Sequence, residues 1–152
     1  MADTIEAKVI HRSPAKPEQV YDAWLEPAKV RRWMAASLKQ SGLAGEMVEC
    51  VIDPVIGGRF VFSDMRDGAE ARHWGHYRHL ERPGKLAFTW ITADADSNDP
   101  SKVTLLIEPD PDGPGAVVTL QHEMLAKWAD YRERTEQSWR RMLEQIDVLV
   151  AS

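Results

Sequence analysis

The stretch WADYRERTEQSWRRMLEQIDVLV, residues 128–150, decides the fold of this chain. The side chains of one face recur every three to four residues with charged residues between them, which predicts an amphipathic helix of about 23 residues, ~35 Å long. A helix with a single apolar stripe needs an apolar surface of matching length to pack on. The residues of this stripe are Trp128, Thr135, Trp139, Met142, Leu143, Ile146 and Val150.

An antiparallel sheet is the surface that the rest of the chain predicts for this helix. Short segments with strand-like alternation are separated by turn signals such as Asp67-Gly68 and Pro83-Gly84. Consecutive strands joined by short turns build an antiparallel meander with its helices on one face. The predicted strands are residues 4–11, 46–53, 59–62, 73–80, 86–91, 103–107 and 116–124, and residues 93–102 are expected to form an exposed loop.

Two short helices are expected after the first strand. Pro17 suits the first turn of a helix because its missing N–H costs little there, and Pro27 ends that helix and can open the next one. Trp24 and Trp33 each lie on a face with helical spacing, so both are predicted to be buried. The predicted fold class is therefore α+β: a curved antiparallel sheet of about six to seven strands wrapped around a long C-terminal helix.

Composition narrows the class of protein. The chain has 152 residues, which favours a single domain over residues 1–152. Its 19 Lys and Arg against 24 Asp and Glu give a net charge of −5 without a long basic run, so nucleic-acid binding is disfavoured. The chain contains no run of ~18 apolar residues, so no membrane span is predicted. Residues 1–6 carry no secretory signal, which favours a cytoplasmic location. The single Cys50 excludes an internal disulfide and is predicted to be a small buried hydrophobe.

Five strings, in order along nearly the whole chain, resemble those of a known family. They are Pro14-Ala15 through Val20-Tyr21-Asp22-Ala23-Trp24 to Trp33-Met34, Asp53-Pro54-Val55-Ile56-Gly57-Gly58-Arg59-Phe60, Gly75-His76-Tyr77, Leu86-Ala87-Phe88-Thr89-Trp90, and Ser138-Trp139 with Leu143 and Ile146. The chain resembles the helix-grip fold of the START/Bet v 1-like (SRPBCC) superfamily. The closest branch resembles the bacterial proteins named for homology to the activator of Hsp90 ATPase. That family more often has Gly where this chain has Ser138, so detailed cavity shape does not carry over.

The space between a curved sheet and a helix is filled by side chains or left as a cavity. Large aromatic side chains with few polar groups are typical of small-molecule pockets, and buried indole N–H groups can orient a ligand. We therefore predict that a small hydrophobic or amphipathic molecule binds between the sheet and the C-terminal helix, in a binding, carrier or sensing module without a cofactor. The candidate ligand-binding residues are Trp33, Phe60, Phe62, Phe88, Trp90, His122 and Trp139, and a core filled by side chains is the alternative.

Two other functions stay open. An enzyme of the cyclase, dehydratase or hydrolase type, as in other branches of the superfamily, needs two polar groups that converge in the cavity. His122 is the one inward candidate, and no catalytic residue is assigned. The other is a stress- or chaperone-related interaction module, which the family's name implies. The eukaryotic co-chaperone carries an additional domain for which this chain has no room, so a chaperone partner is not expected. A homodimer is left open.

Three histidines at regular spacing raise the question of a metal site. His73, His76 and His79 would share one face of a helix, but Trp74, Tyr77 and the other residues around them predict a strand. On a strand, His76 points away from His73 and His79, which lie ~20 Å apart. We therefore expect no metal site, and histidines that are solvated or packed at an edge.

Two further patterns have simple structural interpretations. Gly57-Gly58 precede a strand rather than a helix, which favours a positive φ or a bulge over a phosphate-binding loop. Tyr131, Arg132 and Arg134 near the start of the last helix could rim a cavity mouth, and we interpret them as a solvated face.

Overall fold

The computed structural model describes residues 3–92 and 100–151 and confirms the predicted α+β fold. Seven strands form one antiparallel sheet in the order β1-β7-β6-β5-β4-β3-β2. Each strand after β2 pairs with its predecessor, and β1 closes the far edge on β7. The elements are β1 (Thr4–Ser13), α1 (Pro17–Leu25), α2 (Pro27–Gln40), β2 (Met47–Ile52), β3 (Arg59–Arg66), β4 (Ala69–Glu81), β5 (Lys85–Trp90), β6 (Ser101–Pro109), β7 (Ala116–Leu125), the 3₁₀ helix η2 (Ala126–Tyr131) and α3 (Arg132–Ala151).

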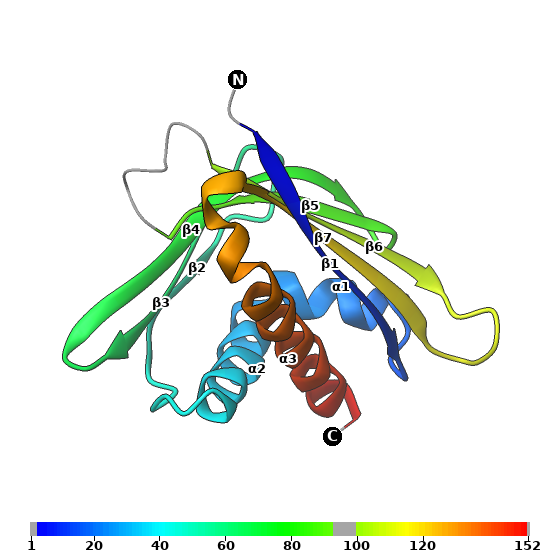
Figure 1. The fold of residues 1–152 in the computed structure, drawn as a ribbon. Coiled ribbons are helices and arrows are strands. Elements are labelled where there is room, and N and C mark those ends of the chain that lie inside the picture. The colour runs from blue at the N-terminus through cyan, green and yellow to red at the C-terminus, as the bar shows by residue number, and fades with distance from the viewer. Residues whose placement is uncertain (1–2, 93–99, 152) are drawn as a thin grey trace.

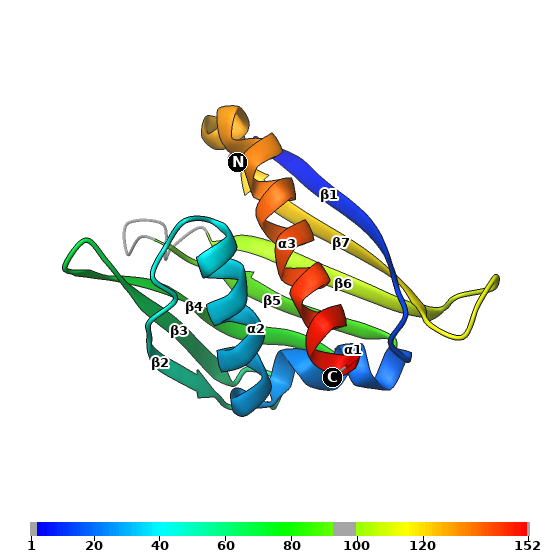
Figure 2. The ribbon, with the colours of Figure 1, turned by 90° about the horizontal axis from the view of Figure 1, so that it is seen from below.

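Helices α1, α2 and α3 lie on the concave side of the curved sheet (Figure 1, Figure 2). In Figure 1 the sheet arches over α2 and α3, with α1 beneath the strands at one end. The view from below in Figure 2 shows α2 and α3 side by side across the strands. The predicted loop over residues 93–102 falls mostly outside the described residues, and its last two residues belong to β6. No helix in the described part of the chain is long and apolar enough to cross a membrane.

Strand alternation builds the core. In β7 the side chains of Val118, Leu120 and His122 all face inward and are at most 5% exposed. Residues at every second position share one face of a strand, so this register also determines that His122 points at the helices. Trp24 and Trp33 are buried as predicted, at 3% and 1% exposed.

The last helix is shorter than the sequence predicted. Periodicity indicated a helix from Trp128, but α3 begins at Arg132, and Trp128 lies in η2 with a non-helical φ of −100° and ψ of 16°. Two turns of 3₁₀ helix, with three residues per turn, produce nearly the same spacing as an α-helix, so periodicity cannot separate the two. The buried stripe of α3 itself is as predicted, with Trp139, Leu143 and Ile146 at most 2% exposed.

Polar contacts fasten the C-terminal half of α3 to β1. The Asp147 carboxylate lies 2.7 Å from Nε2 of His11 and also accepts a hydrogen bond from the hydroxyl of Ser13. In the N-terminal half of α3, the Glu136 carboxylate accepts the backbone N–H of Lys8 in β1.

Glycines act where the backbone has no room for a side chain. Gly57 has a φ of +84°, and a Cβ on Gly58 would lie 2.2 Å from the Asp53 carbonyl oxygen, so the turn before β3 is confirmed as a structural one. A Cβ on Gly75 of β4 would lie 2.0 Å from the Thr89 carbonyl oxygen. This close approach of β4 to β5 comes just before the register shift between Tyr77 and His79.

Candidate functional site

A pocket of about 630 Å³ opens between α2, the N-terminal half of α3 and the sheet. Helix α2 lines it with Met34, Ser37 and Leu38, and Ser41, the residue that caps the C-terminus of α2, also lines it. Trp90 of β5 and Met142 of α3 add large apolar surfaces. The pocket is therefore amphipathic, with an apolar wall and several hydroxyl and charged groups around it.

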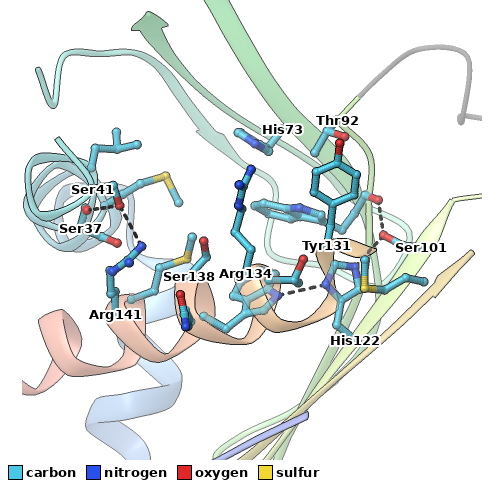
Figure 3. Close-up of a pocket in the computed structure, with 18 of the residues that line it drawn as sticks. Ser37, Ser41, His73, Thr92, Ser101, His122, Tyr131, Arg134, Ser138 and Arg141 are labelled. Atoms are coloured by element: carbon cyan, nitrogen blue, oxygen red, sulfur yellow. Dashed lines mark hydrogen bonds between the residues drawn. The ribbon is translucent and has the colours of Figure 1, made fainter. Parts of the chain in front are cut away.

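A chain of hydrogen bonds runs along one wall and starts at Trp139. The indole N–H of Trp139 donates to Nδ1 of His122 at 3.0 Å. Since Nδ1 accepts, the proton of the neutral ring lies on Nε2, which donates to the Ser101 hydroxyl oxygen at 2.8 Å. The Ser101 hydroxyl in turn donates to the Trp90 carbonyl at 2.6 Å (Figure 3). Every polar atom of His122 is thus satisfied inside the protein.

Burial keeps His122 neutral. The residue is 5% exposed, and loss of solvation lowers the pKa of its imidazole from 6.5 to about 4. The neutral ring holds Trp139 and Ser101 in place through its two hydrogen bonds. It has no free nitrogen for a proton transfer to a bound molecule.

His73 is the second histidine of the pocket, and its position corrects our expectation. We expected a solvated or edge-packed ring, but His73 stacks on Trp90 with ring centroids 5.0 Å apart and planes 23° apart. Burial, and after it the Arg66 charge, lowers the pKa of His73 to about 4. The strand prediction for β4 is confirmed, and His76 on its other face is exposed. Among the residues that the structure describes, no three His, Cys, Asp or Glu side chains come together as metal ligands.

The start of α3 contributes cations to the pocket. Tyr131 and Arg134, which we interpreted as a solvated face, both line it, and the Arg134 guanidinium lies 5.7 Å from the Tyr131 ring centroid. Arg141, two turns further on, donates to the hydroxyl of Ser41, just after the end of α2, at 3.3 Å. In Figure 3 Arg134 reaches toward His73, and Arg141 toward Ser41 on the opposite side.

The seven sequence-predicted site residues fall into three places. Trp90, His122 and Trp139 line the pocket. Phe60, Phe62 and Phe88 lie instead in an aromatic cluster around a void of only about 10 Å³, where Trp24 packs 6.2 Å from Phe88. Trp33 is 1% exposed and donates its indole N–H to the Ala23 carbonyl at 2.8 Å. The indole donors of Trp33 and Trp139 are therefore used within the protein.

Sequence reasoning missed most of the polar side of the pocket. It named Arg134 as able to rim a cavity mouth, but not Ser37 of α2, Ser41 at the end of α2, or Ser138 and Arg141 of α3, which all line the pocket. Spacings of three, four and seven residues place each set on one helix face. That signal was present in the sequence, but polar residues at helical spacing are equally typical of a solvent-facing surface.

The fold and pocket define this chain as a helix-grip protein of the START/Bet v 1-like class, in which a curved antiparallel sheet holds a long C-terminal helix. A family model described as "Activator of Hsp90 ATPase homolog 1-like protein" matches residues 14–151, and the chain belongs to this family. A search of curated proteins found no match.

Solved structures share the same fold. A protein of unknown function from Staphylococcus aureus is similar with a TM-score of 0.81 at 16% identity, over 99% of this chain and 95% of that one. A protein from Rhodobacter sphaeroides has a TM-score of 0.77 at 21% identity, over 96% and 91%. An AHSA1-like protein from Aeromonas hydrophila has a TM-score of 0.74 at 19% identity, over 97% and 92%. At these identities the likeness concerns the fold.

Proposed function

We propose that this protein binds a small amphipathic molecule in the pocket between α2, α3 and the sheet. The observation that carries the proposal is the volume of about 630 Å³ together with its lining. Pockets that hold small molecules span roughly 300–1,000 Å³ and combine apolar walls with a few placed polar groups. The space beside Phe60 and Phe88, in contrast, is too small for any ligand.

Burial of apolar ligand surface supplies most of the affinity. At ~25 cal/mol per Å² of apolar surface removed from water, an aromatic body of modest size gains several kcal/mol. Trp90 offers one such surface: His73 stacks on its ring, and Trp139 meets it edge-on at 5.1 Å between centroids. These contacts hold Trp90 in place before a ligand arrives, which reduces the entropy cost of binding.

A binding role is better supported than the enzymatic alternative. Catalysis at this site needs two polar groups that are free to act on a substrate. His122 and Ser101 are close together, but they bond each other, Trp139 and the Trp90 carbonyl. The polar groups that remain around the pocket are mostly hydroxyl and guanidinium groups, which are suited to holding a ligand.

Filling the pocket tests the proposal. Ser138 lies half-buried in its lining on α3, so a Ser138→Trp side chain would occupy ligand space. We expect this variant to bind the neutral dye N-phenyl-1-naphthylamine at least about tenfold more weakly than wild type, measured by the rise in dye fluorescence on titration.

The matched control is Arg140→Trp, which adds the same side chain at an exposed position of the same helix. It should bind the dye like wild type, and circular dichroism should show both variants folded. Equal dye binding by the two tryptophan variants, or no binding by wild type, would rule out this pocket as the site.

A further inference from the structure

The distribution of charge in the pocket points to a more specific ligand. We propose that the bound molecule carries an oxyanion, a carboxylate or a phosphate ester, which Arg134 and Arg141 hold while its apolar body lies on Trp90. This inference rests on the proposed function and names the chemical class of its ligand.

The first argument is the charge of the lining. Its charged side chains, within the described residues, are the guanidinium groups of Arg66, Arg134 and Arg141 against the single carboxylate of Asp64, an excess of two positive charges. His73 and His122 add none near neutral pH, since both have a pKa of about 4. The whole chain, in contrast, has a net charge of −5. Positive charge is therefore concentrated in the pocket of an acidic protein.

The second argument is that one of the three cations is already neutralised. Arg66 and Asp64 form a two-point pair, with Nε to Oδ2 at 2.7 Å and Nη2 to Oδ1 at 3.2 Å. Asp64 is 4% exposed, so this carboxylate is committed to its partner and unavailable to the other two arginines. The excess charge belongs to Arg134 and Arg141.

The third argument is that the partners of these two arginines are neutral. Arg134 lies over the Tyr131 ring, and Arg141 donates to the Ser41 hydroxyl. Neither forms a salt bridge with a carboxylate of the described residues. A guanidinium remains charged at all physiological pH values and presents a planar fork of donors that matches carboxylate and phosphate oxygens. Both forks therefore keep donors for a ligand.

The fourth argument is the geometry of the helix. Residues 134 and 141 lie seven positions apart on α3, two turns or ~10 Å along its axis, so both are on the same face. Ser138 lies between them on that face. Figure 3 shows the two arginines reaching to opposite sides of the pocket, Arg134 near His73 and Arg141 near Ser41. An oxyanion that enters the pocket between α2 and α3 therefore has a guanidinium group on each side, Arg134 on one and Arg141 on the other.

A set of matched probes tests the inference. We expect wild type to bind 2-naphthylacetate about tenfold more tightly than the neutral, isosteric 2-naphthylacetamide, measured by calorimetry in low salt. The preference should shrink in 0.5 M salt, because charges that are partly exposed are screened. A parallel titration with 2-naphthyl phosphate separates the two sources of the oxyanion: the tighter of the two anions identifies the head group.

Two variants test whether Arg134 and Arg141 cause the preference for the anion over the amide. The double variant Arg134→Gln/Arg141→Gln should bind acid and amide with nearly equal affinity, whereas Arg140→Gln, at an exposed position between them, should keep the wild-type ratio. No preference for either anion in wild type, or a preference that survives in the double variant, would overturn the inference. Binding of N-phenyl-1-naphthylamine to the same wild-type sample distinguishes that result from failure of the proposed function.

Discussion

Acidification from pH 6.5 to 4.5 should lower the free energy of unfolding by about 2–3 kcal/mol for each of His73 and His122. Burial lowers the pKa of both imidazoles to about 4 in the folded protein, against 6.5 for an ordinary histidine. Between these two values the unfolded chain takes up protons that the folded chain does not. The stabilisation is therefore complete above pH 6.5 and is lost as the pH falls towards 4.

Asp22 and Glu81 contribute to the pH dependence mainly at the acid end of this window. The Arg82 guanidinium lowers the pKa of Asp22, and His79 lowers that of Glu81, so these groups stabilise the folded state at every pH above their unfolded values near 4. Their contribution is lost as the pH falls through those values, which overlaps the acid end of the range in which the histidines act. The part of the decline in stability that lies above about pH 5 can thus be attributed to the imidazoles.

One substitution isolates His122. The variant His122→Asn removes the titrating ring but places an amide oxygen near Nδ1, where it can accept the Trp139 indole N–H. In urea unfolding at a series of pH values, we expect the free energy of unfolding of this variant to fall on acidification by about half as much as that of wild type. The control His76→Asn changes an exposed ring on the outer face of β4 and should follow the wild-type curve. If His122→Asn also follows that curve, His122 is not held neutral as described.

The fold could be predicted from the sequence because each of its signals is local. Pro17 and Pro27 mark the helix starts, β7 alternates strictly, and Trp139, Leu143 and Ile146 follow one helix face. None of these patterns depends on what lies opposite. The start of α3 was placed too early, since a 3₁₀ turn and an α-helical turn have nearly the same spacing.

The pocket could not be predicted in the same way, and Phe88 and Trp90 show why. Both belong to the inward face of β5, with ring centroids 6.0 Å apart. Trp24 of α1 covers Phe88 and leaves a void of only about 10 Å³, whereas Trp90 borders the open space next to α2 and α3. An alternating pattern gives the direction of a side chain but not the distance to the opposite layer.

Trp139 should be the most costly single side chain of the pocket to remove. It is 2% exposed and lies where α3 meets α1 and the sheet, with ring centroids 6.0 Å from Trp24, 5.1 Å from Trp90 and 5.7 Å from His122. Truncation leaves a cavity and also an unsatisfied Nδ1 on a buried imidazole. We expect Trp139→Ala to destabilise the protein by roughly 3–5 kcal/mol in denaturant unfolding.

Two companion variants separate the causes of this loss. Trp139→Phe keeps much of the aromatic packing but lacks the donor to His122, so its cost should be about 1–3 kcal/mol, the usual penalty for a buried polar atom without a partner. Trp128→Ala removes an indole of the same size that is 39% exposed in η2, and should cost less than about 1 kcal/mol. A Trp139→Ala cost no greater than that of Trp128→Ala would contradict the central position of Trp139. If Trp139→Phe is as stable as wild type, the bond to His122 contributes nothing, and the hydrogen-bonded wall of the pocket does not depend on it.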